Sequence, residues 1–341
     1  MRFVVDLTSD IVDAVESLIR QKRYRSVQDF LFTSARNQLY VEEHDLGEVT
    51  LEQHGRDIPV SVPISEQLTQ PWTGKVGYEL LSPDIDKVQT IPPPEPNQVR
   101  TEIFGLWNRF FPIKITVRVL ANMLNGNGST VPLDALQENA SSTAREFGKN
   151  LAKKERDLRR KRAEMVSTAL PTKRDEFRAK ARFKSHFVGY INKGRIEGAP
   201  ATLRFLNMLK DQNGKVSVGL TDAGLKFASL ANPVIIGSDF NSSFSEEERR
   251  FLIDHIAAEL PEEMKLIRFT LQAIKRGATS PEAVHEALKK LRCDLDETDL
   301  RTLRSGILSR MSELKLLTRI RIGLTVRYQV TSIGEQLLRE D

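Results

Sequence analysis

The chain has only one cysteine, Cys293, among its 341 residues. A single thiol cannot form an internal disulfide or supply a cysteine-based zinc site, so disulfide-stapled and zinc-finger folds are excluded. Cys293 falls at the predicted end of a helix. We expect its side chain to be buried there as a small hydrophobic group.

The sequence also lacks long apolar runs and the motifs of common enzymes. No run approaches the ~18 residues of a membrane span. Asp6, Asp10 and Asp13 stand where a signal peptide needs an apolar core, so we expect a cytoplasmic protein. Phosphate-binding glycine loops, dinucleotide fingerprints, zinc-protease helices and nucleophile elbows are absent. We therefore expect no enzymatic activity, no cofactor and no bound metal.

Two fragments of a nuclease motif do occur, Pro83-Asp84 and Glu263-Met264-Lys265. They lie nearly 180 residues apart, and the second falls in a helical stretch rather than on a strand. The five histidines are scattered, with no pair at metal-ligand spacing. We attribute the fragments to chance, and a nuclease is the third hypothesis.

The composition that is present, 40% hydrophobic and 28% charged residues, is ordinary for a globular protein of two or three domains. Segments with helical spacing of apolar residues outnumber short alternating segments. The expected fold class is therefore mainly α with small β elements (α+β). The net charge of +5 is mild, but it is unevenly distributed.

A short strand and two helices are predicted within residues 1–43. The strand alternates two sets of side chains, Phe3, Val5 and Leu7 against Arg2, Val4 and Asp6. A helix follows from Thr8 or Ser9, and a second opens at Ser26 with the capping box Ser26-x-x-Asp29. This unit buries too little surface to fold alone, and a second copy would complete its core.

The pattern resembles the ribbon-helix-helix family (the MetJ, Arc and CopG type), obligate dimers that bind DNA. In that family two strands pair into a ribbon that enters the major groove. The resemblance implies a homodimer and DNA contacts from the following residues: Arg2, Val4 and Asp6 on the ribbon, and Arg25 and Ser26 at the second helix. Asp6 would repel phosphates, and residues 1–43 carry six basic and seven acidic groups. A plain dimerisation cap is therefore the alternative.

Residues 44–97 hold eight of the fifteen prolines and lose helical periodicity. The run Ile91-Pro-Pro-Pro-Glu-Pro96 predicts polyproline II, which is semi-rigid. We interpret the segment as a proline-rich linker that tethers the N-terminal domain.

An eleven-residue pattern, x-x-[LV]-T-x-x-G-x-x-[FL]-[AL], occurs at 218–228 and again at 328–338, 110 residues later. It predicts a strand, a threonine that caps a helix, and a glycine that lets the helix pack closely. The pattern resembles the end of a winged helix-turn-helix domain, where the last wing strand leads into a helix. The resemblance implies two such domains, at 98–235 and 244–341.

In the second copy, Ser245 opens a leading helix with a capping box, and three helices then follow, over 264–276 and from Ser280 and Asp296. A hairpin is predicted over 317–322 and 325–330. In a DNA-binding domain of this type, the third helix enters the major groove and the wing reaches phosphates or the minor groove. The implied contacts are Arg301 and Arg304 on the helix, and Arg319, Arg321 and Arg327 on one side of the wing.

The alternative for this copy is a winged helix that binds protein partners, because residues 244–341 hold seventeen basic and seventeen acidic residues. The outer face of its third helix also includes Ser305 and Arg310.

The first copy is predicted to have helices over 100–110, 113–124 and 132–137, and a long third helix from Ser141 or Ser142 to about Met165. Residues 144–184 contain fifteen basic and six acidic residues, or +9, so the rest of the chain sums to −4. A basic stripe recurs every three or four residues along the third helix: Arg145, Lys149, Lys153, Arg156 and Arg160. Such a stripe is typical of nucleic-acid backbone contact; a solvated face is the alternative. Aromatic residues are sparse here, which favours duplex over single-stranded nucleic acid.

The sequence thus predicts a dimeric protein that binds double-stranded DNA and acts by binding alone, most simply as a transcriptional regulator. Tethering several weak DNA-binding domains would raise their effective concentration. The second hypothesis is an interaction subunit whose winged helices hold protein partners in a DNA-associated complex of genome maintenance, plasmid partition or phage defence.

Overall fold

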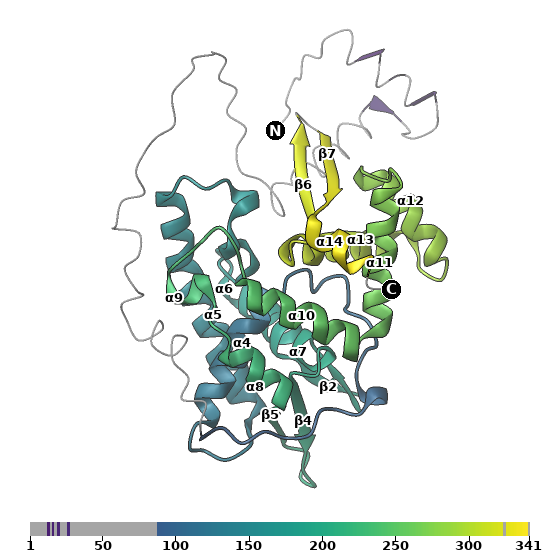
Figure 1. Ribbon diagram of the computed structural model, residues 1–341. Helices are drawn as coiled ribbons and strands as arrows, with labels where there is room; N and C mark the ends of the chain where they lie inside the picture. Colours follow the sequence, from purple (N-terminus) through teal and green to yellow (C-terminus); the bar gives the residue numbers. More distant parts are fainter. Residues whose placement is uncertain are drawn as a thin grey trace. The chain divides into compact units, whose positions relative to one another are not determined.

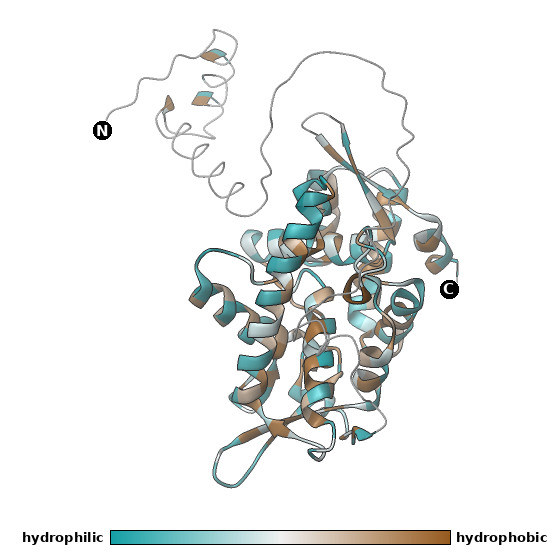
Figure 2. Cartoon of the chain, turned by 90° about the vertical axis from the view of Figure 1, so that its left-hand side faces the viewer, coloured by the Kyte–Doolittle hydropathy of each residue, from teal (hydrophilic) through white to brown (hydrophobic). Residues whose placement is uncertain are grey.

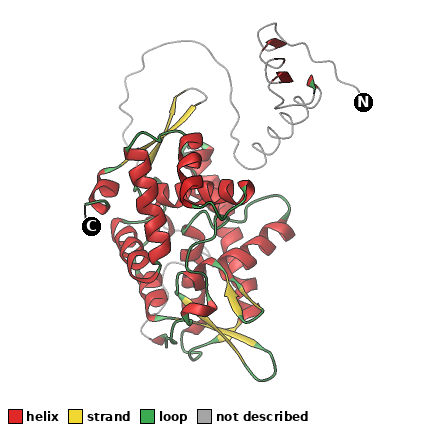
Figure 3. Cartoon of the chain, turned by 90° about the vertical axis from the view of Figure 1, so that its right-hand side faces the viewer, coloured by secondary structure: helices red, strands yellow, loops and turns green. Residues whose placement is uncertain are grey.

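The computed structural model describes residues 87–322 and 325–339, together with Val12, Asp13, Glu16, Ile19, Arg20, Ser26 and Val27. Of the described residues, 87–158 and 166–339 form one compact unit, which we call the main unit, and Arg159–Met165 belong to another. The main unit is mostly helical with small antiparallel sheets (Figure 3), which agrees with the predicted α+β class. No helix among the described residues is long and apolar enough to cross a membrane.

Little of the predicted N-terminal domain is described. Val12, Asp13, Glu16, Ile19 and Arg20 are helical, where a helix was predicted, and Val27 is helical after a bend at Ser26. The predicted strand, with Arg2, Val4 and Asp6, lies outside the described residues, and so do Arg25 and residues 44–86.

The first half of the main unit contains α4 (Phe111–Leu124), β1 (Val131–Pro132), α5 (Leu133–Asp157), α6 (Glu176–Phe183), a π-helical turn (Lys184–Val188), β2 (Tyr190–Asn192), β3 (Arg195–Glu197), α7 (Ala199–Thr202), β4 (Leu206–Lys210), β5 (Val216–Leu220), α8 (Asp222–Ser229) and α9 (Pro233–Ile236) (Figure 1). The second half contains α10 (Glu246–Glu259), α11 (Pro261–Lys275), α12 (Pro281–Leu291), α13 (Glu297–Glu313), β6 (Leu317–Ile322), β7 (Thr325–Val330) and α14 (Ser332–Leu337).

The described strands form three small antiparallel sheets. One has the order β1-β5-β4, and the pairs β2-β3 and β6-β7 make the other two. Most predicted helix starts of the second half are confirmed. Ser245 and Glu248 form the capping box of α10, and the Ser280 and Asp296 side chains cap α12 and α13.

The eleven-residue repeat forms the same capped turn twice. The Thr221 hydroxyl accepts a hydrogen bond from the Gly224 N–H at 3.1 Å, and the Thr331 hydroxyl accepts one from the Gly334 N–H at 3.2 Å. A Cβ added to either glycine would overlap a backbone carbonyl oxygen of the segment that enters the hairpin. The predicted threonine cap and closely packed helix are confirmed in both copies.

The repeat also extends to the residues that precede each hairpin. Arg204 and Lys315 both have a left-handed backbone, with φ of 56° and 57°. Their carbonyl oxygens each accept a 2.6 Å hydrogen bond, from the hydroxyls of Thr221 and Thr331 respectively. Residues other than glycine rarely adopt this conformation. Its occurrence at the same place in both copies identifies a shared chain turn.

A third feature shared by the copies is the segment beside the second hairpin strand. Val131 of β1 pairs with Val218 of β5. In the second copy, the Tyr328 N–H of β7 donates to the Thr279 carbonyl at 2.7 Å. Val218 and Tyr328 are the first residues of the two motif copies, so the same extended contact is made at equivalent positions.

The two copies differ between this segment and the hairpin. The second copy has α12 and α13, whereas the first has one continuous helix, α5, so the predicted break at Ser141 or Ser142 is wrong. The Ser141 hydroxyl instead donates to the Glu138 carbonyl within the helix, at 3.2 Å. The helix is continuous because one buried apolar face runs along it at spacings of three or four: Leu133, Leu136, Ala140, Ala144, Phe147 and Leu151.

Helix α5 ends at Asp157 rather than near Met165 as predicted. Arg159 has a left-handed backbone, with φ of 53°, which stops the helix. The buried Glu155 carboxylate accepts hydrogen bonds from the Val166 and Ser167 N–H groups, at 2.6 and 3.2 Å. This fixes the point at which the chain re-enters the main unit.

The helix predicted over 100–110 is absent, because buried carboxylates bind the backbone of this segment in an irregular path. The Ile103 N–H donates to Glu263 of α11 at 3.0 Å, and the Phe110 N–H donates to Glu313 of α13. Gly105 lies directly against the backbone of Gly306 in α13. The segment therefore connects the halves by packing between them.

The two predicted domains share one continuous hydrophobic core, which extends from Val99 to Leu337. The described end of the proline-rich segment is also docked. The Ile91 N–H donates to the Leu220 carbonyl at 2.8 Å, and the Pro92 carbonyl accepts from Asn207 at 3.0 Å.

The two long hairpins project from opposite ends of the main unit, β6-β7 from one end and β4-β5 from the other (Figures 1 and 2). Helix α5 begins beside β5 and is 25 residues long, or about 37 Å. Its hydrophilic C-terminal turns lie toward the end that carries β6-β7 (Figure 2).

Candidate nucleic-acid interface

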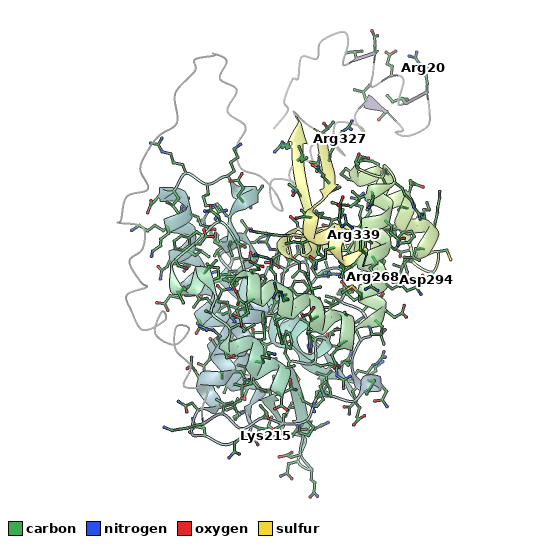
Figure 4. All side chains as sticks on the ribbon, in the orientation of Figure 1. Arg20, Lys215, Arg268, Asp294, Arg327 and Arg339 are labelled. Atoms are coloured by element: carbon green, nitrogen blue, oxygen red, sulfur yellow. The ribbon has the colours of Figure 1, made fainter. Side chains whose placement is uncertain are left out.

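The β6-β7 hairpin is the most basic hairpin of the described chain. Arg319, Arg321 and Arg327 are all exposed on it, and the Arg327 side chain lies on the projecting strands (Figure 4). Residues 314–331 contain four basic residues and no acidic one. The hairpin therefore presents positive charge without neighbouring carboxylates from its own sequence, as phosphate contact requires.

The strand register corrects the prediction that the three arginines share one side. Arg319 lies opposite Tyr328 and Arg321 opposite Val326, whereas Arg327 lies opposite Ile320. Residues opposite each other in an antiparallel pair point to the same face. Arg327 is therefore on the other face from Arg319 and Arg321, because odd-numbered residues of β6 pair with even-numbered residues of β7, a register that the sequence alone does not fix. The hairpin carries arginines on both faces.

Helix α13 presents few basic groups to solvent. Arg301 is exposed but pairs with Glu297 at 3.5 Å, and Arg304 is half-buried with a hydrogen bond to the Pro281 carbonyl at 3.3 Å. The predicted inner stripe, from Leu300 to Leu314, is buried as expected. Base contacts from this helix would rest mainly on Arg301 and its small polar neighbours.

Arg310 was predicted on the outer face of this helix and is instead completely buried. Its guanidinium pairs with Glu263 at 2.7 Å and donates to the carbonyls of Trp107 and Ile103, at 3.1 and 3.4 Å. The connecting segment covers this face of α13, which the sequence did not reveal. Arg310 and Glu263, the acid of the supposed nuclease fragment, join the two halves.

The predicted basic stripe on α5 is interrupted at both ends. Arg145 is buried, so it cannot contact a ligand, whereas Lys149, Lys153 and Arg156 are exposed as predicted. Arg160 lies beyond the end of the helix and belongs to the other unit. Arg145 was misassigned because the segment after α5 folds back over it. The stripe that remains covers about two turns of the C-terminal half of α5.

Arg145 clamps this returning segment. Its guanidinium donates to the carbonyls of Pro171 and Lys173, at 2.7 and 2.9 Å, and pairs with Glu176 at 3.0 Å. A second clamp lies about two turns earlier on α5, where Glu138 binds Lys180 and Lys184, both at 2.6 Å. Hydrogen bonds from Lys180, Lys184 and Ser142 lower the pKa of Glu138 to about 2. Both clamps fix α6 onto α5.

The segment held by these clamps carries the feature that the sequence did not single out. Phe177, the second residue of α6, is 83% exposed, more than any other large hydrophobic residue in the described part of the chain. The sequence places Phe177 among basic residues but does not indicate that its side chain faces solvent.

The other titratable side chains in the part of the chain that the structure describes form no metal-binding cluster. Among the residues that the structure describes, no three His, Cys, Asp or Glu side chains could hold a metal ion together. The His255 ring is stacked on Phe251 and tilted against Phe205, and burial lowers its pKa. Cys293 follows α12 as predicted, but it is exposed, so its predicted burial is wrong.

Ser26 is exposed, and the other predicted contacts of the N-terminal domain lie outside the described residues. The opposite hairpin, β4-β5, has Lys210 and Lys215 beside Asp211, and Lys215 lies at the far end of the main unit from Arg327 (Figure 4). No protein-family model, curated protein or solved structure matches the chain.

Proposed function

We propose that the chain is a dimeric protein that binds double-stranded DNA, most simply a transcriptional regulator that acts by binding alone. The observation that carries the proposal is the β6-β7 hairpin, with exposed Arg319, Arg321 and Arg327 and no acidic residue from 314 to 331. Arginines on a projecting hairpin fit the minor groove and its flanking phosphates.

The order of elements supports the proposal by analogy. Both halves contain, in this order, a helix, a short extended segment, further helices, a hairpin and a final helix. In both, the second hairpin strand contacts the extended segment. This order resembles a winged helix-turn-helix domain, in which the hairpin is the wing. A fold can host several functions, so the charge on the hairpin carries more weight than this likeness.

The exposed part of the α5 stripe gives a second basic surface. Lys149, Lys153 and Arg156 lie on its C-terminal half, toward the end of the main unit from which β6-β7 projects (Figure 2). We assign the N-terminal domain to dimerisation on its resemblance to ribbon-helix-helix proteins. A dimer would present each of these basic surfaces twice.

The test is the binding of the full chain to a labelled duplex of about 30 base pairs at about 50 and about 200 mM salt. The variant Arg319→Ala/Arg321→Ala/Arg327→Ala should bind more weakly. Its slope of log affinity against log salt should fall by up to ~3, because each lost phosphate contact removes about 0.9.

The matched control removes three exposed basic residues from the hairpins of the first half, Arg195→Ala/Lys210→Ala/Lys215→Ala. It changes the net charge equally and should leave the salt slope close to wild type. Equal losses in the two variants would show a nonspecific charge effect. A wild-type chain that fails to bind at about 50 mM salt would contradict the proposed function.

One observation favours the alternative, an interaction subunit. An apolar groove of 460 Å³ lies on α10, α11 and α12, lined in part by Met264, Phe269 and Leu291, and α13 offers few basic groups to a DNA groove. Copurification with a protein partner that Phe269→Glu abolishes would favour this function, together with a duplex affinity that the Arg319→Ala/Arg321→Ala/Arg327→Ala variant leaves unchanged.

A further inference from the structure

We propose that Phe177 is an apolar wedge that inserts between base pairs of a bound duplex and kinks it, with the arginines around it held by the flanking phosphates. The inference rests on the proposed function and assigns it a second contact, separate from the β6-β7 hairpin. It also predicts a change in DNA shape.

The exposure of Phe177 is anomalous for a residue of its size. The residue is 83% exposed, and the next most exposed large hydrophobic residue of the described chain, Leu106, is 52% exposed. Leaving a phenylalanine in water forgoes the stabilisation that its burial would bring. Nothing within α6 covers the ring. The residue one turn on is the small Ala181, and Lys180 is drawn toward Glu138 at 2.6 Å.

The ring is surrounded by positive charge. Arg174, Arg178 and Arg182 are all exposed on the same segment, and residues 173–184 hold six basic and two acidic residues. Both acids are engaged: Asp175 caps α6 and pairs with Arg178 at 3.3 Å, and Glu176 pairs with Arg145 at 3.0 Å. A stack of bases bordered by phosphates matches this surface in shape and charge, because the apolar side chain faces the bases and the surrounding arginines face the phosphates.

The segment is also fixed in place, as a wedge must be. The buried Arg145 and the carboxylate of Glu138 tie α6 and the residues before it to α5 through five hydrogen bonds or ion pairs. A ring on a firmly held helix transmits force to the base step. By order in the chain, α6 follows α5 and precedes the β2-β3 pair, α7 and the β4-β5 hairpin.

A single exposed ring favours duplex insertion over a single-stranded platform. Proteins that bind single strands stack successive bases on several aromatic residues, and no second exposed aromatic residue occurs within α6, where the other one, Phe183, is buried. One apolar side chain inserted at one base step is instead typical of proteins that kink duplex DNA.

The experiment is a bend measurement on the full chain. A duplex of about 30 base pairs, with a donor and an acceptor dye at its ends, is titrated with protein, and end-to-end energy transfer and affinity are recorded together. The wild-type chain should shorten the end-to-end distance. Phe177→Ala should lose this bend and bind about tenfold more weakly. Phe177→Leu should retain most of the bend, because leucine also acts as a wedge.

The matched control is Leu209→Ala, which removes another exposed hydrophobic side chain, 45% exposed, from the β4 strand. It should leave the bend unchanged. Equal thermal midpoints would show that the variants are folded, as expected for exposed sites. Binding with an unchanged bend in Phe177→Ala, or no bend in the wild type, would overturn the wedge and leave the proposed function intact. If Phe177→Ala lost only the binding of a protein partner and kept the bend, that result would also overturn the wedge. Absence of duplex binding by the wild type and every variant would overturn both the wedge and the proposed function.

Discussion

Charged residues of the main unit divide into those that hold the fold together and those that remain at the surface, and the sequence does not distinguish them. Arg145 and Arg310 were both predicted at exposed helix faces, and both are buried against carbonyl oxygens and a carboxylate. Arg319 and Lys153 were also predicted at exposed faces, and they are exposed. Tertiary contacts, which helical spacing cannot show, decide between the two outcomes.

The Arg310–Glu263 pair should be among the most sensitive positions in the chain. Both side chains are completely buried. Arg310→Met leaves the Glu263 carboxylate without its partner and should lower the free energy of unfolding by about 3–5 kcal/mol. Denaturant unfolding measures this change. Arg301→Met, on the exposed face of the same helix, should shift it by no more than about 0.5 kcal/mol. Equal shifts would mean that the buried pair contributes little.

Glu138 gives a pH dependence with a definite sign. Its pKa is lowered from 4.5 to about 2 by its lysine and serine donors. The contribution of this carboxylate to stability is therefore present above pH 4.5 and is lost as the pH falls toward 2. Glu138→Gln should be less stable than wild type at pH 7, and the difference should shrink steadily below pH 4.5. It should stay under about 1 kcal/mol, because the side chain is 55% exposed.

The measurement is the denaturant midpoint of wild type and Glu138→Gln across this range. Glu146→Gln, at an exposed position of the same helix, gives the baseline for removal of one carboxylate. A difference that is constant with pH would exclude the titration of Glu138 as its cause.

At the scale of the elements, local sequence patterns predicted most of the second half. Cap residues and apolar spacing act within a few residues, so the starts of α10, α12 and α13 and both strands of the β6-β7 hairpin were found. The first half was predicted less well. The continuity of α5 depends on a core face that overrides two serines, and the irregular path of 99–110 depends on carboxylates about 160 to 200 residues away.

The candidate site was likewise only partly predictable. Exposed arginines on the hairpin follow from strand alternation, but their faces depend on the register. The exposure of Phe177 depends on how α6 is clamped to α5, which no local pattern records.

The glycine of each repeat should tolerate no side chain. A Cβ on Gly334 would overlap the Leu316 carbonyl oxygen, the acceptor of the Thr331 N–H at 3.1 Å. Gly334→Ala should destabilise the chain by about 1–3 kcal/mol through overpacking, even though alanine favours helix. Thermal unfolding measures this. Ser332→Ala, an exposed position in the same helix, serves as the control, and a stabilised Gly334→Ala would contradict the close packing.

At the scale of the molecule, the shared core predicts that the two halves unfold together. Trp107 lies in the connecting segment and is buried between them. In a Trp72→Phe background its fluorescence reports the junction alone, because the chain has two tryptophans. Fluorescence and far-UV circular dichroism should give one coincident denaturant transition. A junction that melts before the helices would show two independent domains.

The docking of 99–110 between the halves also has a consequence for valency. Two binding domains joined by a flexible linker can bind side by side on one short target, and each raises the effective concentration of the other. The halves here share a core, and their hairpins point away from each other (Figure 1). A short straight ligand bound at one hairpin cannot reach the other. If both hairpins bound ligands, one copy of the chain would therefore hold those two ligands apart at a fixed spacing.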